Sequence, residues 1–154
     1  MRHLVLCLVV LGISCVRSGP TGDRQAGGVA PSNPARSSPA TTAVEAAAKF
    51  AITNYVDEST RTQGVVCVEL DVSDDPGKVL DRLSPLVSRI SSGRKECLGR
   101  EPSAILSIGS PQVAGDRARV DVGVVLGSAG MLELERHQGS WVVVRATSPW
   151  LSLR

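Results

Sequence analysis

The sequence predicts an α+β domain in which N-terminal helices pack on an antiparallel sheet of about four to five strands. Three observations predict this class. Apolar residues recur at helical spacing after residue 42 and again after residue 76, whereas from residue 104 onward they alternate with polar residues. Short turns containing glycine separate the alternating runs. Such alternation is typical of an antiparallel sheet with one buried face, and the upstream helices are the expected cover for that face.

Residues 1–15, MRHLVLCLVVLGISC, are predicted to be a signal peptide, because a positive start precedes a ten-residue apolar run at positions 4–13. The run is too short to cross a bilayer as a helix, which takes about 20 residues. The final GISC resembles the bacterial lipobox, which implies that Cys15 is the lipid-attachment residue. Gly12 stands where the lipobox usually has leucine, so ordinary signal cleavage a few residues later, or no cleavage, stays an alternative.

Residues 16–40 are predicted to be a disordered linker. Gly, Pro, Ser and Ala supply 16 of its 25 residues, a composition that cannot bury enough apolar surface to offset the entropy of ordering. The remaining 114 residues, 41–154, are enough for a single small domain. An acylated cysteine followed by such a linker would hold this domain clear of a membrane surface.

The first helix of the domain is expected to begin at Thr42, because Thr42 and Glu45 have the spacing of a capping box. Its apolar positions continue at helical spacing to Tyr55, and Gly64 is the expected stop. The β-branched segment VVCVELDV then predicts a strand over residues 65–72.

Asp75 and Pro76 predict the cap and first turn of a second helix. Helical spacing continues from there to Ile90, interrupted at Pro85, where Ser84-Pro85 could restart a second short helix. The meander follows, with strands and turns expected in this order: strand 104–109, turn 110–115, strand 117–126, turn 127–130, a strand through Leu132 and Leu134, a tight turn at Gln138-Gly139, and a final strand 141–147.

The four cysteines are expected to have three different fates. Cys7 leaves with the signal peptide and Cys15 is acylated, so Cys67 and Cys97 remain as an even pair in an exported protein, where disulfides persist. Their bond would staple the second helix to the first strand. A free buried Cys67 is one alternative, and a metal site is another, although two cysteines without a neighbouring histidine do not complete a zinc shell.

Composition and motifs exclude several classes of function. A formal net charge of +2 removes the electrostatic reason to expect nucleic acid as a partner. No sequence motif for a nucleophile elbow, a phosphate-binding loop or a zinc protease is present, so neither a cofactor nor a metal is expected. His137 is predicted to be a solvated turn residue. Arg117 and Arg119 are expected to share the outward face of a strand with Asp121 and to form cross-strand charge pairs. Glu133 and Glu135 are expected on a solvated strand face.

The order helix, strand, helix and meander, ending in Gly139-Ser140-Trp141-Val142-Val143, resembles the nuclear-transport-factor-2-like (cystatin-like) superfamily, which includes small bacterial exported proteins. The resemblance covers roughly residues 42–152 and implies a curved sheet that forms a cone-shaped pocket with the helices. Enzymes of that superfamily use an Asp, His or Tyr inside the pocket. The corresponding pocket residues here would be Tyr55, Asp57 and His137, although they match no catalytic pattern.

Residues 112–115, QVAG, and Pro149-Trp150 also resemble the two inhibitory loops of cystatins. The hairpin is one residue short and no strand follows Pro149-Trp150, so protease inhibition is not expected.

The leading expectation is therefore an exported protein, anchored in the cell envelope (periplasmic or outer face) through lipid on Cys15, and secreted if Cys15 is not acylated. It would act as a non-enzymatic binding or accessory module for a protein or a small molecule. The alternative is a small-molecule isomerase or hydratase of the same fold, which needs a titratable group in an apolar pocket. Homodimerisation through the sheet is compatible with either.

Overall fold

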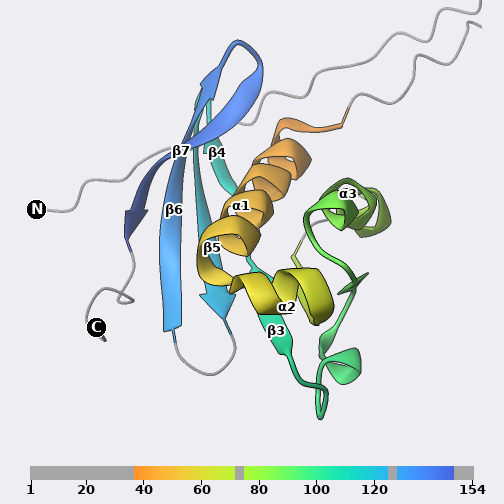
Figure 1. The fold of residues 1–154 in the computed structure, drawn as a ribbon. Helices are drawn as coiled ribbons and strands as arrows, with labels where there is room; N and C mark the ends of the chain where they lie inside the picture. Colours follow the sequence, from red (N-terminus) through yellow and green to blue (C-terminus); the bar gives the residue numbers. More distant parts are fainter. Residues whose placement is uncertain (1–36, 72–74, 125–127, 148–154) are drawn as a thin grey trace, which may run out of the picture. The chain divides into compact units, whose positions relative to one another are not determined.

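A mixed sheet, with three helices against one of its faces, forms the domain (Figure 1). The computed structural model describes residues 37–71, 75–124 and 128–147, all of which belong to one unit, Ala35–Arg154. In these ranges the helices are α1 (Pro39–Tyr55), α2 (Glu58–Gln63) and α3 (Pro76–Leu83), with 3-10 turns η1 (Ser84–Leu86) and η2 (Arg94–Glu96). The strands are β1 (Val65–Leu70), β2 (Ile90–Ser91), β3 (Ser103–Ile108), β4 (Gln112–Ala114), β5 (Arg117–Val124), β6 (Ser128–His137) and β7 (Ser140–Thr147).

The α+β class is confirmed, but the sheet is neither wholly antiparallel nor limited to five strands. Seven strands lie in the described ranges, in the order β2-β1-β3-β5-β6-β7, and β4 also pairs with β5. β1 runs parallel to both β2 and β3, and the other pairs are antiparallel. The chain leaves β1, forms α3 and returns to pair Ile90 with Val66, which is a parallel crossover. Ile90, expected at the end of a helix, therefore belongs to a strand of two residues.

The N-cap of the first helix lies four residues before the predicted cap. Ser38 is the N-cap, its Oγ accepts a hydrogen bond from the Thr41 amide at 3.1 Å, and Pro39 occupies the first turn. Thr42 is thus inside the helix and the predicted capping box is wrong. Ser38 provides the same kind of cap as Thr42, and the fixed φ of Pro39 already suits the first turn of a helix. The helix therefore starts here and not at Thr42.

The second and third helices begin at aspartates. The backbone becomes extended at Val56, so the first helix ends there and not at Gly64 as expected; Asp57 caps a separate helix, α2, and Gly64 ends that one. Asp75 caps α3 and Pro76 follows it, and η1 begins at Ser84, both as the sequence indicates. The predicted second helix and short restart are therefore confirmed up to residue 86.

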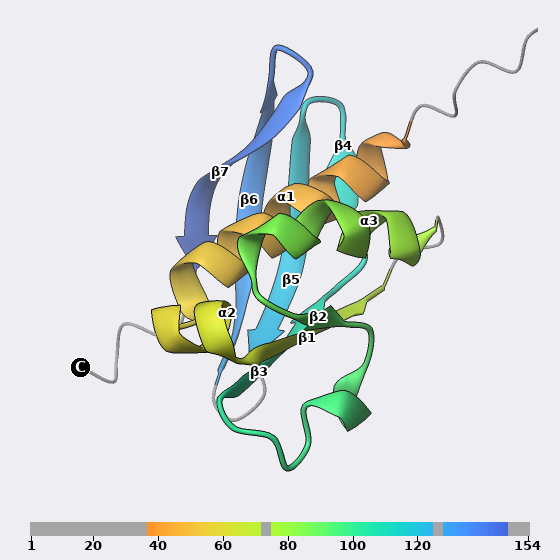
Figure 2. The same ribbon diagram turned by 45° about the vertical axis from the view of Figure 1, so that its right-hand side comes forward.

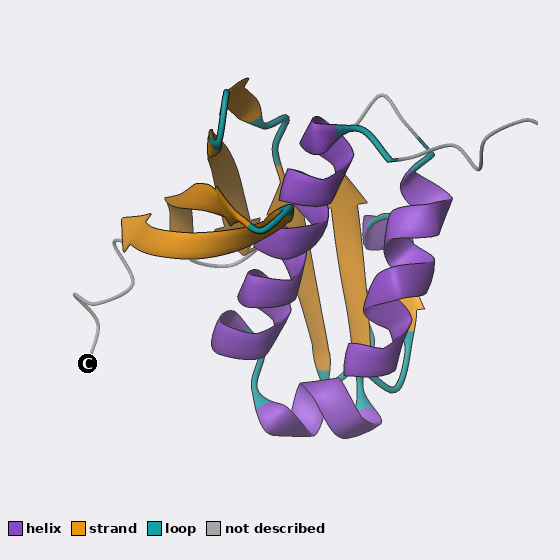
Figure 3. Ribbon diagram, turned by 90° about the horizontal axis from the view of Figure 1, so that it is seen from above, coloured by secondary structure: helices purple, strands orange, loops and turns teal. Residues whose placement is uncertain are grey.

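The helices cover one face of the sheet, and the core lies between the two layers. α1 crosses the sheet with α3 beside it on the same face (Figures 2 and 3). The predicted alternation in β5 is confirmed, because Ala118, Val120 and Val122 are buried while Arg117, Arg119 and Asp121 are exposed. The helix side of the core consists of small and branched residues with no exposed surface: Ala43, Val44, Ala47, Ala48, Ala51 and Ile52. The alanines allow the helix to lie close to the strands.

The predicted tight turn joins β6 and β7. Gln138 and Gly139 both have positive φ, +51° and +85°, as the two-residue hairpin turn that matches strand twist requires. The register between β6 and β7 shifts at Glu133/Leu134, and β7 is visibly bent (Figure 2).

The disulfide between Cys67 and Cys97 is confirmed, with a Cα–Cα distance of 6.1 Å. The disulfide was expected to link the second helix to the sheet, but it does not. Cys97 follows η2, and the pair packs with Val65 and Ile105 in a small buried cluster on the face opposite the helices. The bond therefore ties the connection between β2 and β3 onto that face. The signal peptide, Cys7, Cys15 and the linker up to residue 36 lie outside the described residues, as does Pro149-Trp150.

Candidate binding groove

The three residues suggested for a shared pocket lie at opposite ends of α1. Tyr55 ends the helix and Asp57 follows it. His137 precedes the β6–β7 turn, and Trp141, just after that turn, contacts Pro39 at the helix start. A helix of 17 residues is about 25 Å long. His137 is thus not brought together with Tyr55 and Asp57.

Asp57 has the chemistry of a helix cap. Its Oδ1 accepts hydrogen bonds from the Thr60 amide at 2.9 Å and the Ser59 hydroxyl at 2.6 Å, and its Oδ2 accepts one from the Thr60 hydroxyl at 2.7 Å. The bonds from Ser59 and Thr60 hold the pKa of this carboxyl far below its usual range. A carboxylate so firmly ionised is a poor general base at neutral pH. It does border a hollow of about 740 Å³ between the start of α2 and residues 97–105.

Tyr55 and His137 have equally local surroundings. Tyr55 is half-buried, and its ring meets that of Phe50 edge to face at 5.8 Å. Burial raises the pKa of the Tyr55 phenol, which keeps it protonated. His137 ends β6 and does not lie in the turn, but its side chain is 61% exposed and so solvated as predicted; its Nε2 lies 3.7 Å from Glu135 Oε2. None of this is the buried acid–base geometry that an isomerase needs.

Core side chains occupy the space in which the resemblance implies a cone-shaped pocket. Val44, Ala47 and Ile52 of α1 lie in one buried cluster with Val120 and Leu132 of the sheet, all at 1% exposure or less. The hollow beside Asp57 and the groove described next lie on other surfaces of the domain.

A groove of about 570 Å³ lies on the sheet face opposite the helices, which is within the range of small-ligand sites. A row of paired residues from four neighbouring strands crosses it: Glu69 of β1, Ser107 of β3, Gly123 of β5 and Ala129 of β6. Cys67 and Ile105, two positions earlier on β1 and β3, lie in the small cluster on this face, and side chains two apart share a face. We call this site the acidic groove, for the charges described below.

Small residues make the floor of the acidic groove. Ser107, Gly109, Gly123 and Ala129 stand at positions where larger side chains would fill the space. A Cβ on Gly123 would lie 2.5 Å from Ser107 Oγ, so even an alanine there requires the serine to move. The Ser107 hydroxyl thus lies in the space that a side chain on Gly123 would take.

The charged residues that line the groove are all acidic: Glu69, Asp71 and Asp121. The Arg94 guanidinium pairs with Glu69 through two hydrogen bonds of 3.1 and 3.0 Å. Among the described residues, Asp71 and Asp121 have no ion pair, and both are exposed. The groove therefore presents negative charge that the domain does not neutralise.

The other half of the same face is neutralised. Arg117 lies 3.3 Å from Glu135, and Arg119 lies 3.3 Å from Glu133, so the expected cross-strand pairing of the two arginines is confirmed and the structure identifies their partners. We call these four residues the Arg/Glu strip.

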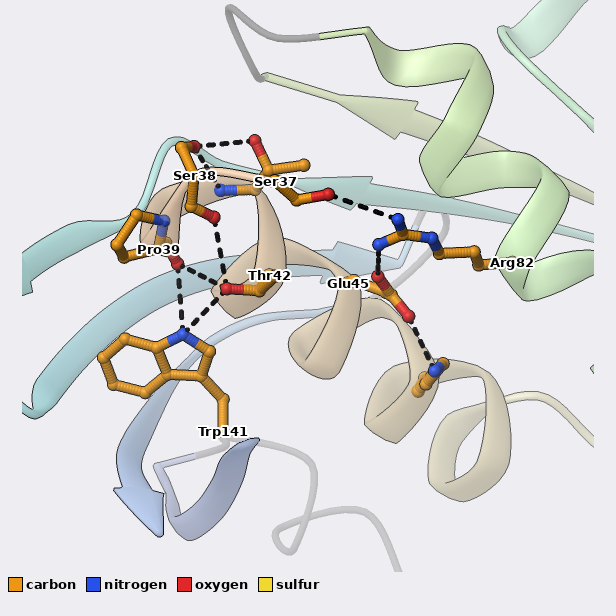
Figure 4. Close-up of polar contacts among 9 residues, drawn as sticks. Ser37, Ser38, Pro39, Thr42, Glu45, Arg82 and Trp141 are labelled. Carbon is orange, nitrogen blue, oxygen red and sulfur yellow. Dashed lines mark hydrogen bonds and ion pairs between the residues drawn. The ribbon is translucent and has the colours of Figure 1, made fainter. Parts of the chain in front are cut away.

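Two further sets of polar contacts join α1 to its neighbours (Figure 4). The Trp141 indole Nε1–H donates to the Pro39 carbonyl and to Thr42 Oγ1, each at 3.1 Å. The Arg136 guanidinium lies 5.6 Å from the centre of the Trp141 ring. The last hairpin is thereby fastened to the start of the first helix.

The second set joins α1 to α3. Arg82 donates to Glu45 Oε2 at 2.8 Å and to Ser37 Oγ at 3.2 Å, and Lys49 donates to Glu45 Oε1 at 2.7 Å. Burial raises the pKa of Glu45, but the bonds from Lys49 and Arg82 outweigh it and lower the pKa overall. Both cations are matched to a carboxylate, so this cluster serves the structure and offers no free charge to a ligand.

The sequence alone did not reveal the acidic groove. The alternation of residues 117–126 predicts that Asp121 faces outward, but nothing in the sequence assigns a role to Ser107 or Ala129. The feature that these two share with Gly123, a small outward residue on each of three strands, becomes visible only when the strand order and register are known.

No family model, curated protein or solved structure matches this chain. In the described part of the chain, no three His, Cys, Asp or Glu side chains are placed to hold a metal ion. None of the described helices has the length and apolar character that a membrane span requires. The geometry of the groove is therefore the main guide to function.

Proposed function

We propose that this protein is an exported, lipid-anchored, non-enzymatic binding module of the cell envelope, and that the acidic groove is its binding surface. The observation that carries the proposal is the groove itself, a hollow of about 570 Å³ on the sheet face that the helices leave uncovered. Its floor is continuous across four paired strands, so a ligand would meet a rigid surface.

The surroundings of the titratable residues support a non-enzymatic role. Asp57 is occupied as a helix cap, Tyr55 is kept protonated by burial, and His137 stands in solvent at the far end of α1. The alternative, an isomerase or hydratase, would have to use Asp57 in the hollow beside α2. Its low pKa argues against proton abstraction there.

The N-terminal sequence supports the anchor. The lipobox-like end at Cys15 is followed by the predicted linker, which ends earlier than residue 40 because Pro39 and Ala40 belong to α1. Residues 16–36 as a flexible coil would span about 25 Å. The linker enters the domain at Ser37 and Ser38, which bond to α3 and α1. The proposed lipid would thus hold the domain near a membrane surface while leaving the groove free to meet a partner.

The anchor is tested by metabolic labelling with palmitate. The wild-type chain is expected to incorporate label and to sediment with membranes, and Cys15→Ala is expected to do neither. Cys67→Ala/Cys97→Ala is the matched control, because it removes cysteines without removing the lipobox-like segment. Equal labelling of wild type and Cys15→Ala, or no labelling of either, contradicts the anchor.

Binding at the groove is tested with the ¹⁵N-labelled full chain in detergent micelles. A set of blocked tetrapeptides of basic, acidic, polar and apolar composition is titrated, and the amide shifts are followed. Shifts from binding are expected to gather at Ser107, Gly109, Gly123 and Ala129, with Ala118 and Leu134 unchanged. Shifts that gather at Ser59, Thr60 and residues 97–103 instead would move the binding surface to the hollow beside Asp57.

A further inference from the structure

We infer that the acidic groove binds an extended basic peptide segment, one that presents two lysine or arginine side chains two residues apart. The inference rests on the proposed function, since it takes the groove to be the binding surface, and it adds the chemical class of the partner. Two sets of observations carry it, the charge of the groove and its dimensions.

The charge is local and unmatched. Every described ionisable residue lining the groove is a carboxylate, and the cations Arg94 and Arg119 are already paired with Glu69 and Glu133. The whole chain has a formal net charge of +2, so attraction of a cationic segment cannot come from the molecule as a whole. Asp71 and Asp121 are the groups that a partner's cations would meet.

The dimensions suit an extended chain. Four strands spaced about 4.8 Å apart give a row about 14 Å long, which is the length of about four extended residues. Gly109 lies between the two free carboxylates, since its amide donates to the Asp121 carbonyl at 2.8 Å and the Asp71 amide donates to the carbonyl of the preceding residue, Ile108, at 2.9 Å. Asp71 and Asp121 are therefore two strand spacings apart, about 10 Å. Side chains two apart on an extended peptide emerge about 7 Å from each other, and the reach of lysine covers the rest.

Other occupants fit less well. An acidic segment would be repelled by Asp71 and Asp121, and a second copy of this chain would bring an identical set of carboxylates to the same place. An apolar segment could pack on the floor, but it would leave the carboxylates of Asp71 and Asp121 without a partner of opposite charge. A basic peptide uses both the open floor and the free charges.

The experiment is a calorimetric titration of the full chain in detergent with the blocked peptide Gly-Lys-Gly-Lys-Gly, compared with Gly-Gln-Gly-Gln-Gly. At low ionic strength the lysine peptide is expected to bind about tenfold more tightly than the glutamine peptide, and to weaken several-fold at physiological salt. Asp71→Asn/Asp121→Asn is expected to lose about that tenfold preference.

The matched control is Glu133→Gln/Glu135→Gln, which removes the same two charges from the Arg/Glu strip on the same sheet face. Its affinity for the lysine peptide is expected to stay within about twofold of wild type. An equal loss in both double variants would overturn the inference, because it would show attraction to overall charge only. Urea midpoints of both variants establish that each is folded.

Two results separate this inference from the proposed function. If the glutamine peptide binds as tightly as the lysine peptide and shifts the groove amides, the charge inference fails while the groove stands as the binding surface. If neither peptide, nor the acidic and apolar ones, shifts the amides of Ser107, Gly123 and Ala129, both fail.

Discussion

The two halves of the open sheet face deal with charge in opposite ways. In the Arg/Glu strip, each arginine on β5 has a glutamate opposite it on β6. In the acidic groove, carboxylates surround a floor of small residues, and two of them have no cation among the described residues. β5 belongs to both halves, with Arg117 and Arg119 at one end and Asp121 and Gly123 at the other.

Exposure to solvent does not distinguish the proposed binding surface from the rest of this face. Both halves are exposed, but only the groove combines missing volume with charge that its own neighbours leave unmatched. The halves are also held to the domain differently, because the groove half is crosslinked by Cys67–Cys97 and the strip half is fastened to α1 through Trp141.

The largest effect is expected from loss of the crosslink beside the groove. Cys67→Ala/Cys97→Ala removes a bond across 30 residues, which the chain-entropy model values at about 3–4 kcal/mol of unfolding free energy. Urea unfolding monitored by tryptophan fluorescence measures the loss. Reduction of the wild-type chain should reproduce it, and a loss below about 1 kcal/mol in both would show that the groove half does not depend on its crosslink.

The strip half should respond to Trp141→Phe. The ring volume is largely kept, but the hydrogen bonds to the Pro39 carbonyl and Thr42 Oγ1 are lost, at a cost of about 1–2 kcal/mol. The exposed neighbour Val142→Ala is the control and should change stability by less than about 0.5 kcal/mol. Thermal unfolding followed by circular dichroism compares the two, and equal shifts would remove Trp141 as the fastening of this half.

Variants of Asp57 test whether this residue, beside the hollow next to α2, serves as a helix cap or as a catalytic group. Asp57→Ala should destabilise the domain by about 1 kcal/mol at pH 7 through loss of the α2 cap, while Asp57→Asn keeps most of it. Because the folded pKa lies below the usual value, this stability is present above about pH 4 and is lost as the pH falls below it. Urea midpoints at pH 7, 5 and 3 measure this, and a difference that grows toward acid would contradict the cap.

The smallest effects are expected from single-charge variants, which compare the Arg/Glu strip with the acidic groove directly. Glu133→Gln and Asp121→Asn remove one carboxylate each from the same face. Glu133→Gln breaks the ion pair with Arg119 and should lower the free energy of unfolding by about 0.2–1 kcal/mol, an effect that high salt weakens. Asp121→Asn breaks no ion pair among the described residues, so it should leave the free energy of unfolding unchanged or raise it slightly. Urea midpoints at low and high salt test this, and equal effects would mean that the halves do not differ electrostatically.

Local patterns predicted much of this fold. The Asp75-Pro76 start, the alternation in β5 and the Gln138-Gly139 turn each depend on a few neighbouring residues, and each is confirmed. The cysteine pair followed from elimination.

The errors concern features that depend on distant partners. A strand of two residues at Ile90 is too short to show an alternation of apolar and polar residues. Its direction is set by pairing with β1, from which α3 separates it along the sequence. The groove likewise exists only because Ser107, Gly123 and Ala129 come into register across three strands. Pairing of this kind is long-range, so no window along the chain contains it.

The Trp141–Pro39 contact also bears on the order in which the domain can assemble. It joins residues 102 positions apart, so α1, which is made first, cannot complete its contacts until the last hairpin has been synthesised. Contacts between such distant residues slow folding, because a long loop must close before they contribute. The Pro39 carbonyl and the Thr42 hydroxyl, which accept from Trp141, would lack this donor until then. Folding of this domain is thus a late and collective event that the final β-hairpin completes.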